Sequence, residues 1–217
     1  MQITSGKNYN PNFQARQIAR TMNCIGKLET KIDLWEVTSR DKTFLKGLLE
    51  NIDFKNLMPN ISSEGVKRWK EMLEISVNDT VAKRVISYLA ISENKPCGII
   101  SFVPGKKQFY ASSICTWPIE CGKKVKFAGK TLFYQLFKTF SESKAKEITL
   151  KAIKDGPFET VPKYKNLGFQ VVDDKHLVEM SMNKYKVKEV YGDLNKIITY
   201  TPLEKQPERD LEYLLHL

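Results

Sequence analysis

Two neighbouring runs of the chain, RVISYLAIS (residues 84–92) and CGIISFV (97–103), carry apolar or β-branched side chains at most positions. A strand that alternates apolar and polar residues has one face in water, whereas a strand that is apolar on both faces is covered on both sides. The turn ENKPCG joins the two runs and predicts a β-hairpin. The hairpin therefore belongs at the centre of a sheet.

Segments on either side of this hairpin have the periodicity of strands or of amphipathic helices. Before it, a strand is expected at residues 31–37, followed by two helices with apolar stripes from Phe44 to Ile52 and from Val66 to Val77. After it, the expected order is a strand at 108–117, a helix with a stripe from Leu132 to Phe140, a strand at 147–153, a short helix ended by Gly168, and strands at 169–172 and 176–182.

The net charge of +10 calls for an anionic partner, such as nucleic acid, a membrane surface or a phosphate-rich cofactor. The lysines are spread along the chain, and no helix-turn-helix, zinc-finger or RNP-type signature accompanies them. The apolar runs are far shorter than the roughly 20 residues that cross a bilayer, and the first residues lack the apolar segment of a signal peptide. We therefore expect a cytoplasmic protein without a membrane partner.

Residue types that hold metals or act as nucleophiles are scarce in this chain. Its four cysteines form no C-x-x-C pair, and neither of its two histidines, His176 and His216, lies near a cysteine. This pattern argues against a zinc site, so we expect no bound metal. It also argues against catalysis by a Ser-His-Asp or Cys-His arrangement.

The stretch KKVKFAGKTLFYQLF (123–137) places lysines and a glycine at the expected start of a helix. The first turn of a helix has unpaired backbone N–H groups and the positive end of the helix dipole, which together bind phosphate groups. Small residues such as Gly129 let a phosphate approach the backbone. The stretch therefore predicts a phosphate site, with an ordinary basic surface as the simpler alternative.

Two segments resemble motifs of the GNAT superfamily of acyl-CoA-dependent N-acyltransferases. KVKFAG (124–129) is similar to the family's phosphate-binding signature Arg/Gln-x-x-Gly-x-Gly/Ala, with Gly129 at the last position and Phe127 where the central glycine stands. YKNLGF (164–169) is similar to the family's Tyr-x-x-Leu-Gly-Phe element. Their order and separation within the strand pattern carry the resemblance.

The resemblance implies an α/β fold of the α+β kind. Its central sheet would be mixed and mostly antiparallel, with about seven strands flanked by helices. The GNAT-like domain would span residues 31–182, after a basic N-terminal arm at 1–30 and before a C-terminal extension at 183–217.

The resemblance also implies acetyl-CoA as the co-substrate. In the family, the pyrophosphate of CoA binds at the helix start, and the pantetheine arm binds the open backbone edge of the fourth strand, here at 108–117. The residues that it implies in cofactor binding are Cys115, Trp117, Ile119, Lys124, Val125, Lys126, Phe127, Ala128, Gly129 and Lys130.

Enzymes of this family transfer the acyl group by direct attack of an amine on the thioester in a ternary complex, so no nucleophilic side chain is needed. Tyr164 matches the position of the proton donor to the departing thiolate. Glu120 is the carboxylate nearest in sequence to the expected acyl position and is the candidate base; Glu36 or a water relay are the alternatives. The acceptor would be an amine-bearing small molecule or protein, and the enzyme a monomer or a homodimer.

Two other functions remain open from the sequence. A degenerate member of the family would bind acyl-CoA without turnover, and the departure at Phe127 favours this alternative. A basic nucleic-acid-binding protein is the other alternative, and Arg16, Arg20 and Lys27 near the N-terminus favour it.

Overall fold

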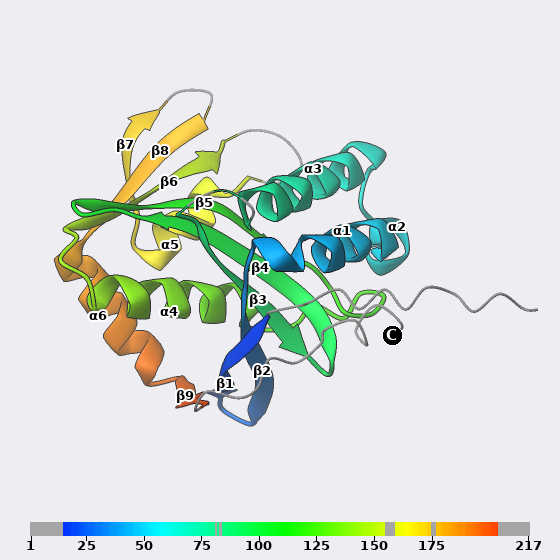
Figure 1. Cartoon of the computed structure of the whole chain (residues 1–217), viewed down its shortest axis with the longest axis horizontal. Coiled ribbons are helices and arrows are strands. Elements are labelled where there is room, and N and C mark those ends of the chain that lie inside the picture. The colour runs from blue at the N-terminus through cyan, green and yellow to red at the C-terminus, as the bar shows by residue number, and fades with distance from the viewer. Residues whose placement is uncertain (1–14, 81, 83, 155–158, 175–176, 204–217) are drawn as a thin grey trace, which may run out of the picture.

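The computed structural model describes residues 15–203, apart from residues 81, 83, 155–158 and 175–176. The described chain forms a nine-stranded sheet of order β7-β8-β6-β5-β4-β3-β2-β1-β9 (Figure 1). Strands β5 and β6 run parallel and the other neighbouring pairs run antiparallel, which confirms a mixed, mostly antiparallel sheet. The strands are β1 (Arg16–Ile25), β2 (Leu28–Val37), β3 (Ile86–Ser92), β4 (Lys95–Pro104), β5 (Gln108–Thr116), β6 (Glu147–Ile153), β7 (Gln170–Asp174), β8 (Leu177–Asn183) and β9 (Ile198–Pro202).

Helices cover both faces of the sheet (Figure 1). A short 3-10 helix (Ser39–Asp41), α1 (Lys42–Asn51), α2 (Phe54–Leu57) and α3 (Ser63–Thr80) follow β2. The other helices are α4 (Ala128–Ser141), α5 (Val161–Leu167) and α6 (Lys184–Asn195). Helices α1 to α3 pack in one hydrophobic core, and α4 to α6 pack in a second core on the opposite face.

The central hairpin is confirmed, because β3 and β4 lie in the middle of the sheet between the two cores. Leu89 and Ile99 are buried in the core beneath α1 to α3, whereas Tyr88 and Ile100 are buried in the core beneath α4. Full burial of each such side chain stabilises the fold by roughly 1.5–3 kcal/mol. The consecutive apolar residues of these strands therefore pack alternately against the helices on the two faces of the sheet.

Residues 16–25 fall within the stretch predicted to be an arm, yet they form β1, which pairs with β2 on one side and with β9 on the other. The expectation of an arm is wrong for this segment. Its buried face carries the small or polar side chains Ala19, Thr21 and Asn23 in place of large apolar ones, so the usual strand signal is absent.

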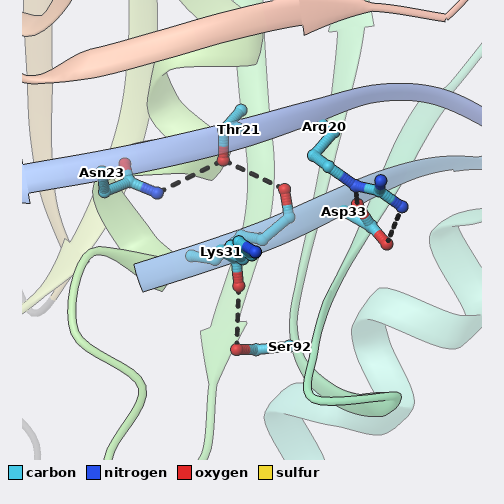
Figure 2. A network of polar contacts seen from close by, with 7 residues as sticks. Arg20, Thr21, Asn23, Lys31, Asp33 and Ser92 are labelled. Atoms are coloured by element: carbon cyan, nitrogen blue, oxygen red, sulfur yellow. Dashed lines mark hydrogen bonds and ion pairs between the residues drawn. The ribbon is translucent and has the colours of Figure 1, made fainter. Parts of the chain in front are cut away.

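Two of the buried polar side chains of β1, Thr21 and Asn23, take part in a hydrogen-bond network (Figure 2). Thr21 donates to the carbonyl of Ile32 at 3.0 Å, and Asn23 donates to the hydroxyl of Thr21 at 3.2 Å. The Asn23 side-chain oxygen accepts a hydrogen bond of 3.1 Å from the hydroxyl of Thr131 in the first turn of α4. The first turn of α4 is therefore anchored to β1, which fixes where this helix begins.

The C-terminal extension contributes α6 and β9 to the fold. Helix α6 packs against α4, where the Tyr134 hydroxyl donates to the Asn195 side chain at 2.6 Å. Strand β9 extends the sheet beyond β1. Residues 204–217 of the predicted extension lie outside the described residues.

Candidate functional site

Strands β5 and β6 pair over only part of their length. Residues 108–111 of β5 are in parallel register with 147–150 of β6, whereas β5 continues to Thr116 and β6 to Ile153. The ladder between β4 and β5 has an extra residue at Ser112, and a bulge of this kind bends a strand. The two strands therefore diverge towards their C-terminal ends.

A cleft of about 490 Å³ is lined by the divergent end of β5 and by α5, the helix that follows β6. Helices α3 and α4 complete its wall from opposite faces of the sheet. The lining residues are Trp69, Ile114, Thr116, Gly129, Lys130, Phe133, Thr160, Lys163, Tyr164, Asn166 and Leu167. Lysines are the only charged residues among the described lining residues, so the cleft favours an anionic ligand.

The backbone edge of β5 in this cleft differs in register from the predicted one. The Trp117 N–H donates to the Cys97 carbonyl at 3.0 Å, and the Ile119 N–H donates to the Lys123 carbonyl at 3.3 Å. Backbone groups of an antiparallel strand point alternately to its two neighbours, so those of Ile114 and Thr116 point away from β4.

These hydrogen bonds do not support Trp117 and Ile119 as main-chain donors to a ligand. The side chains of Cys115 and Trp117 are buried in the core beneath α1 to α3. Trp117 and Ile119 instead line a separate hollow of about 280 Å³ beside α1 and α2. The backbone groups of β5 that point away from β4 therefore belong to Ile114 and Thr116. They are offset by one residue from the predicted Cys115 and Trp117.

The start of α4 forms one end of the cleft. Phe127 precedes the helix and provides no side-chain hydrogen bond to its first turn. The N–H groups of a first helical turn lack intrahelical partners and carry the positive end of the helix dipole. A Cβ added to Gly129 would meet only the Thr116 methyl group, at 3.9 Å, so a ligand can approach the backbone here.

Phe127 has the backbone conformation that favours glycine. Its φ is 69° and its ψ is −3°, which is the left-handed region. Side chains other than glycine adopt this region at a cost of roughly 1–2 kcal/mol. The sequence departs from the GNAT signature in the side chain at this position, but the backbone is still one that suits the glycine of that signature.

This conformation predicts different stabilities for two substitutions at Phe127. Both Phe127→Gly and Phe127→Ala remove the ring and its cation–π contact with Lys130, which lies 5.9 Å from the ring centroid. Only glycine also removes the cost of the left-handed backbone. We expect Phe127→Gly to be more stable than Phe127→Ala by about 1 kcal/mol in urea unfolding. Equal stability of the two variants would contradict a strained Phe127.

The other predicted residues of the phosphate loop lie around the cleft without lining it. Lys124 and Lys126 are exposed, Val125 packs against the core beneath α4, and Ala128 is buried. Gly129 and Lys130 are the two residues of the predicted set that reach the cleft. The exposed lysines add positive charge near the helix start, which is screened by salt.

Tyr164 lines the cleft from α5. Its ring packs edge-on against Phe133 and Phe169, with centroid distances of 5.9 and 6.1 Å. Burial, and to a smaller extent the nearby Cys115 thiol, raise the pKa of Tyr164 to about 12. The hydroxyl therefore stays protonated near neutral pH, as a proton donor must.

Glu120 is exposed on the loop after β5 and does not line the cleft. Lys95 donates to its carboxylate at 3.1 Å, and the Lys123 ammonium lies 3.9 Å from it. The hydrogen bond from Lys95 and the charges of both lysines lower the pKa of Glu120. A carboxylate that is held ionised outside the cleft is a poor general base, so the structure does not support that role for Glu120.

The alternative base, Glu36, is also engaged elsewhere. Its carboxylate accepts a hydrogen bond of 2.6 Å from Arg16 on β1, and it does not line the cleft. The described lining residues include no carboxylate at all. Of the three bases considered from the sequence, this leaves the water relay.

Several lining residues were not predicted as site residues from the sequence. Trp69 belongs to the apolar stripe of α3 and stacks on Phe54, with a centroid distance of 6.2 Å. Lys163 directly precedes the motif YKNLGF, Asn166 lies within it, and Thr116 lies between two predicted residues. A pattern in one sequence marks the helix or strand of these residues but not the side that faces a cleft.

Two further features of the described chain bear on its function. Among the described residues, no group of three or more His, Cys, Asp or Glu side chains is arranged to hold a metal ion. Both histidines, His176 and His216, lie outside the described residues. No helix in the described part of the chain has the length and apolar character needed to span a membrane.

Solved structures share this fold. An uncharacterized protein from Bacillus halodurans matches with a TM-score of 0.54 at 12% identity, over 83% of this chain and 98% of the other. FdhC, described as a nucleotide-linked sugar GNAT, matches with a TM-score of 0.52 at 18% identity, over 84% and 97%. The PaiA N-acetyltransferase from Thermoplasma acidophilum, solved with coenzyme A, has a TM-score of 0.49 at 19% identity, over 70% and 98%.

No protein-family model matches the sequence, and no curated protein matches it either. The likeness to solved structures therefore rests on the arrangement of strands and helices. It confirms at the level of the fold the GNAT resemblance that the two sequence motifs carried.

Proposed function

We propose that this chain, which has the GNAT fold, is an N-acyltransferase that moves an acetyl group from acetyl-CoA to a primary amine. The observation that carries the proposal is the cleft at the divergence of β5 and β6. The first turn of α4, which has no side-chain cap from Phe127, lies at one end of this cleft, and Tyr164 lies in its wall. The likeness to FdhC supports the same class of reaction.

The donor would lie along the cleft in an order set by its chemistry. The pyrophosphate is the most negative part, so it belongs at the first turn of α4, beside Gly129 and Lys130. The amide groups of the pantetheine arm suit the open backbone edge at Ile114 and Thr116. The thioester would then lie near Tyr164.

The chemistry needs no side-chain nucleophile. The nitrogen of the amine attacks the thioester carbonyl carbon, a C–N bond forms, the C–S bond breaks, and the electron pair leaves on sulfur. The thiolate takes the proton of the Tyr164 hydroxyl, which solvent later replaces. The proton that the amine gives up passes to water, because no carboxylate is among the described lining residues.

The acceptor is a primary amine on a small molecule or a protein. FdhC is described as a nucleotide-linked sugar GNAT, and an amino sugar nucleotide is an anionic acceptor that a chain with a net charge of +10 would attract. Amino sugar nucleotides therefore belong in a test panel beside simple amines, amino acids and peptides.

The experiment that tests the proposal is the release of the CoA thiol from acetyl-CoA with and without each amine. Release that depends on the amine, with an acetylated product detected by mass spectrometry, is the expected result. Acetyl-CoA binding without release on any amine would favour the degenerate acyl-CoA-binding alternative. Failure to bind acetyl-CoA would exclude both.

A further inference from the structure

The charge of the cleft comes from two lysines on two of its walls. Lys130 belongs to the first turn of α4, and Lys163 belongs to α5. The ion pairs of the described residues involve neither lysine. No carboxylate stands among the described lining residues to neutralise them. Two positive charges are therefore available to the molecules that bind in the cleft.

The backbone of Lys163 is fixed by the way α5 begins. The Thr160 N–H donates to the Ile153 carbonyl at 2.9 Å, and the Thr160 hydroxyl accepts a hydrogen bond of 2.8 Å from the Ile153 N–H. These bonds join the start of α5 to the end of β6. Pro162 stands in the first turn of the helix and pre-sets its backbone. Lys163 follows directly, so its stem leaves a rigid part of the wall next to Tyr164.

Lys163 lies away from the phosphate end of the cleft. Asn166 and Leu167, near the C-terminal end of α5, line both this cleft and a second hollow, and Lys130 does the same. Lys163 does not line the second hollow and precedes Asn166 by roughly 4.5 Å along the helix axis. The C-terminal end of α5 is therefore next to the start of α4, and Lys163 lies on the side of Tyr164.

The donor supplies an anion for Lys130 but none for Lys163. The charged groups of acetyl-CoA are its phosphates, and the pyrophosphate is proposed to lie at the first turn of α4. The groups proposed to lie near Tyr164, the thioester and the pantetheine amides, are neutral. The other molecule of the ternary complex is the amine. An anion that neutralises Lys163 therefore has to come from the amine.

We propose that Lys163 binds an oxyanion carried by the acceptor, so that the enzyme selects amines that also bear a carboxylate or a phosphate. The inference rests on the proposed function and deepens it by naming the acceptor class. The lysine ammonium is a compact charge that forms charge-assisted hydrogen bonds with either oxyanion. Polyamines are excluded from this class, because their further ammonium groups would meet lysines and no carboxylate among the described lining residues.

Initial rates of CoA release with pairs of amines that differ in the anion test the proposal. Alanine is compared with alaninamide, and glucosamine 1-phosphate with glucosamine, so that the two pairs separate a carboxylate from a phosphate. We expect wild type to use at least one anion-bearing amine with a kcat/KM about tenfold above that of its neutral counterpart. Lys163→Gln should lower this ratio about tenfold through the KM of the anion-bearing amine, with the KM for acetyl-CoA unchanged.

Two further variants separate a local contact from overall charge. Lys163→Arg keeps the charge and should retain most of the preference. Lys70→Gln is the matched control, because Lys70 is an exposed lysine of α3 that does not line the cleft. An equal loss of preference in Lys163→Gln and Lys70→Gln would overturn the inference, because it would indicate only attraction by the net charge.

Other outcomes separate the inference from the proposed function. Neutral amines or polyamines used as well as the anion-bearing ones would overturn the acceptor class while acetyl transfer stood. A raised KM for acetyl-CoA in Lys163→Gln, with the ratio unchanged, would place Lys163 in the donor site and overturn its proposed role. Release of CoA that depends on no amine in the panel would contradict the proposed function itself, and the inference with it.

Discussion

Gly129→Asp is expected to lower the affinity for acetyl-CoA roughly 100-fold while the protein stays folded. The new carboxylate would lie in the first turn of α4, where a negative charge is favourable to the helix dipole. Space is available for it, because a Cβ at this position meets only Thr116, at 3.9 Å. The same carboxylate would lie beside the pyrophosphate. Repulsion between unit charges about 5 Å apart costs about 3 kcal/mol at an effective dielectric constant of about 20, or roughly 100-fold in affinity.

The matched control for this prediction is Gly129→Asn, which adds nearly the same volume without the charge. Calorimetric titration with acetyl-CoA should show a much smaller loss for asparagine than for aspartate, and melting curves should show both variants folded. If Gly129→Asp binds acetyl-CoA as tightly as wild type, the pyrophosphate does not lie at the start of α4. Equal losses of acetyl-CoA affinity in the two variants would mean that the volume of the new side chain, and not its charge, weakens binding.

Tyr164→Phe is expected to lower turnover by roughly 10²-fold with little change in acetyl-CoA affinity. The substitution keeps the ring that packs against Phe133 and Phe169 and removes only the hydroxyl. Without that hydroxyl the thiolate has no protein donor in the proposed arrangement. The measurement is CoA release by wild type and variant on any amine that wild type accepts, with melting curves of both proteins.

Phe169→Leu is a useful control, because it disturbs the packing around Tyr164 and leaves the hydroxyl in place. Equal turnover of wild type and Tyr164→Phe would show that solvent supplies the proton. The raised pKa of Tyr164, about 12, adds a pH test. Because a raised pKa keeps the hydroxyl protonated, its ionisation should cause no fall in turnover below about pH 11. A fall near pH 8 that Tyr164→Phe abolished would contradict this assignment.

Strong periodicity made most of the fold predictable. The buried runs of β3 and β4 and the apolar stripe of α4 have patterns that few other structures accommodate. Strand β1 was missed for a physical reason: it buries Thr21 and Asn23, whose burial is tolerated only through hydrogen bonds to β2 and α4. Such partners are distant in sequence, so the pattern of β1 alone resembles a polar loop.

The site was predictable only where a motif marks the backbone. Gly129 and Tyr164 belong to the two motifs and Lys130 directly follows the first of them, and the structure brings all three to one cleft. The open edge of β5 was misplaced by one residue because its register depends on the hydrogen bond from Trp117 to Cys97 in β4. Pairing of this kind is not encoded in the strand's own pattern.

The glutamate predicted as base shows a second limit of the sequence. Glu120 is near the expected acyl position along the chain, but the turn that follows β5 carries it to the surface beside Lys95. Proximity in sequence is a weak guide to position in a loop, because a turn of a few residues reverses its direction. The absence of a carboxylate among the described lining residues became visible only in the structure.

The most direct test of the central claim, a cleft built for an acyl-CoA, is a melting experiment on the wild-type chain with increasing acetyl-CoA. A ligand at about 100 times its dissociation constant adds roughly 2.7 kcal/mol to the free energy of unfolding. We predict a melting temperature that rises steadily with the acetyl-CoA concentration. An unchanged melting temperature with acetyl-CoA, longer acyl-CoAs and free CoA would contradict the claim.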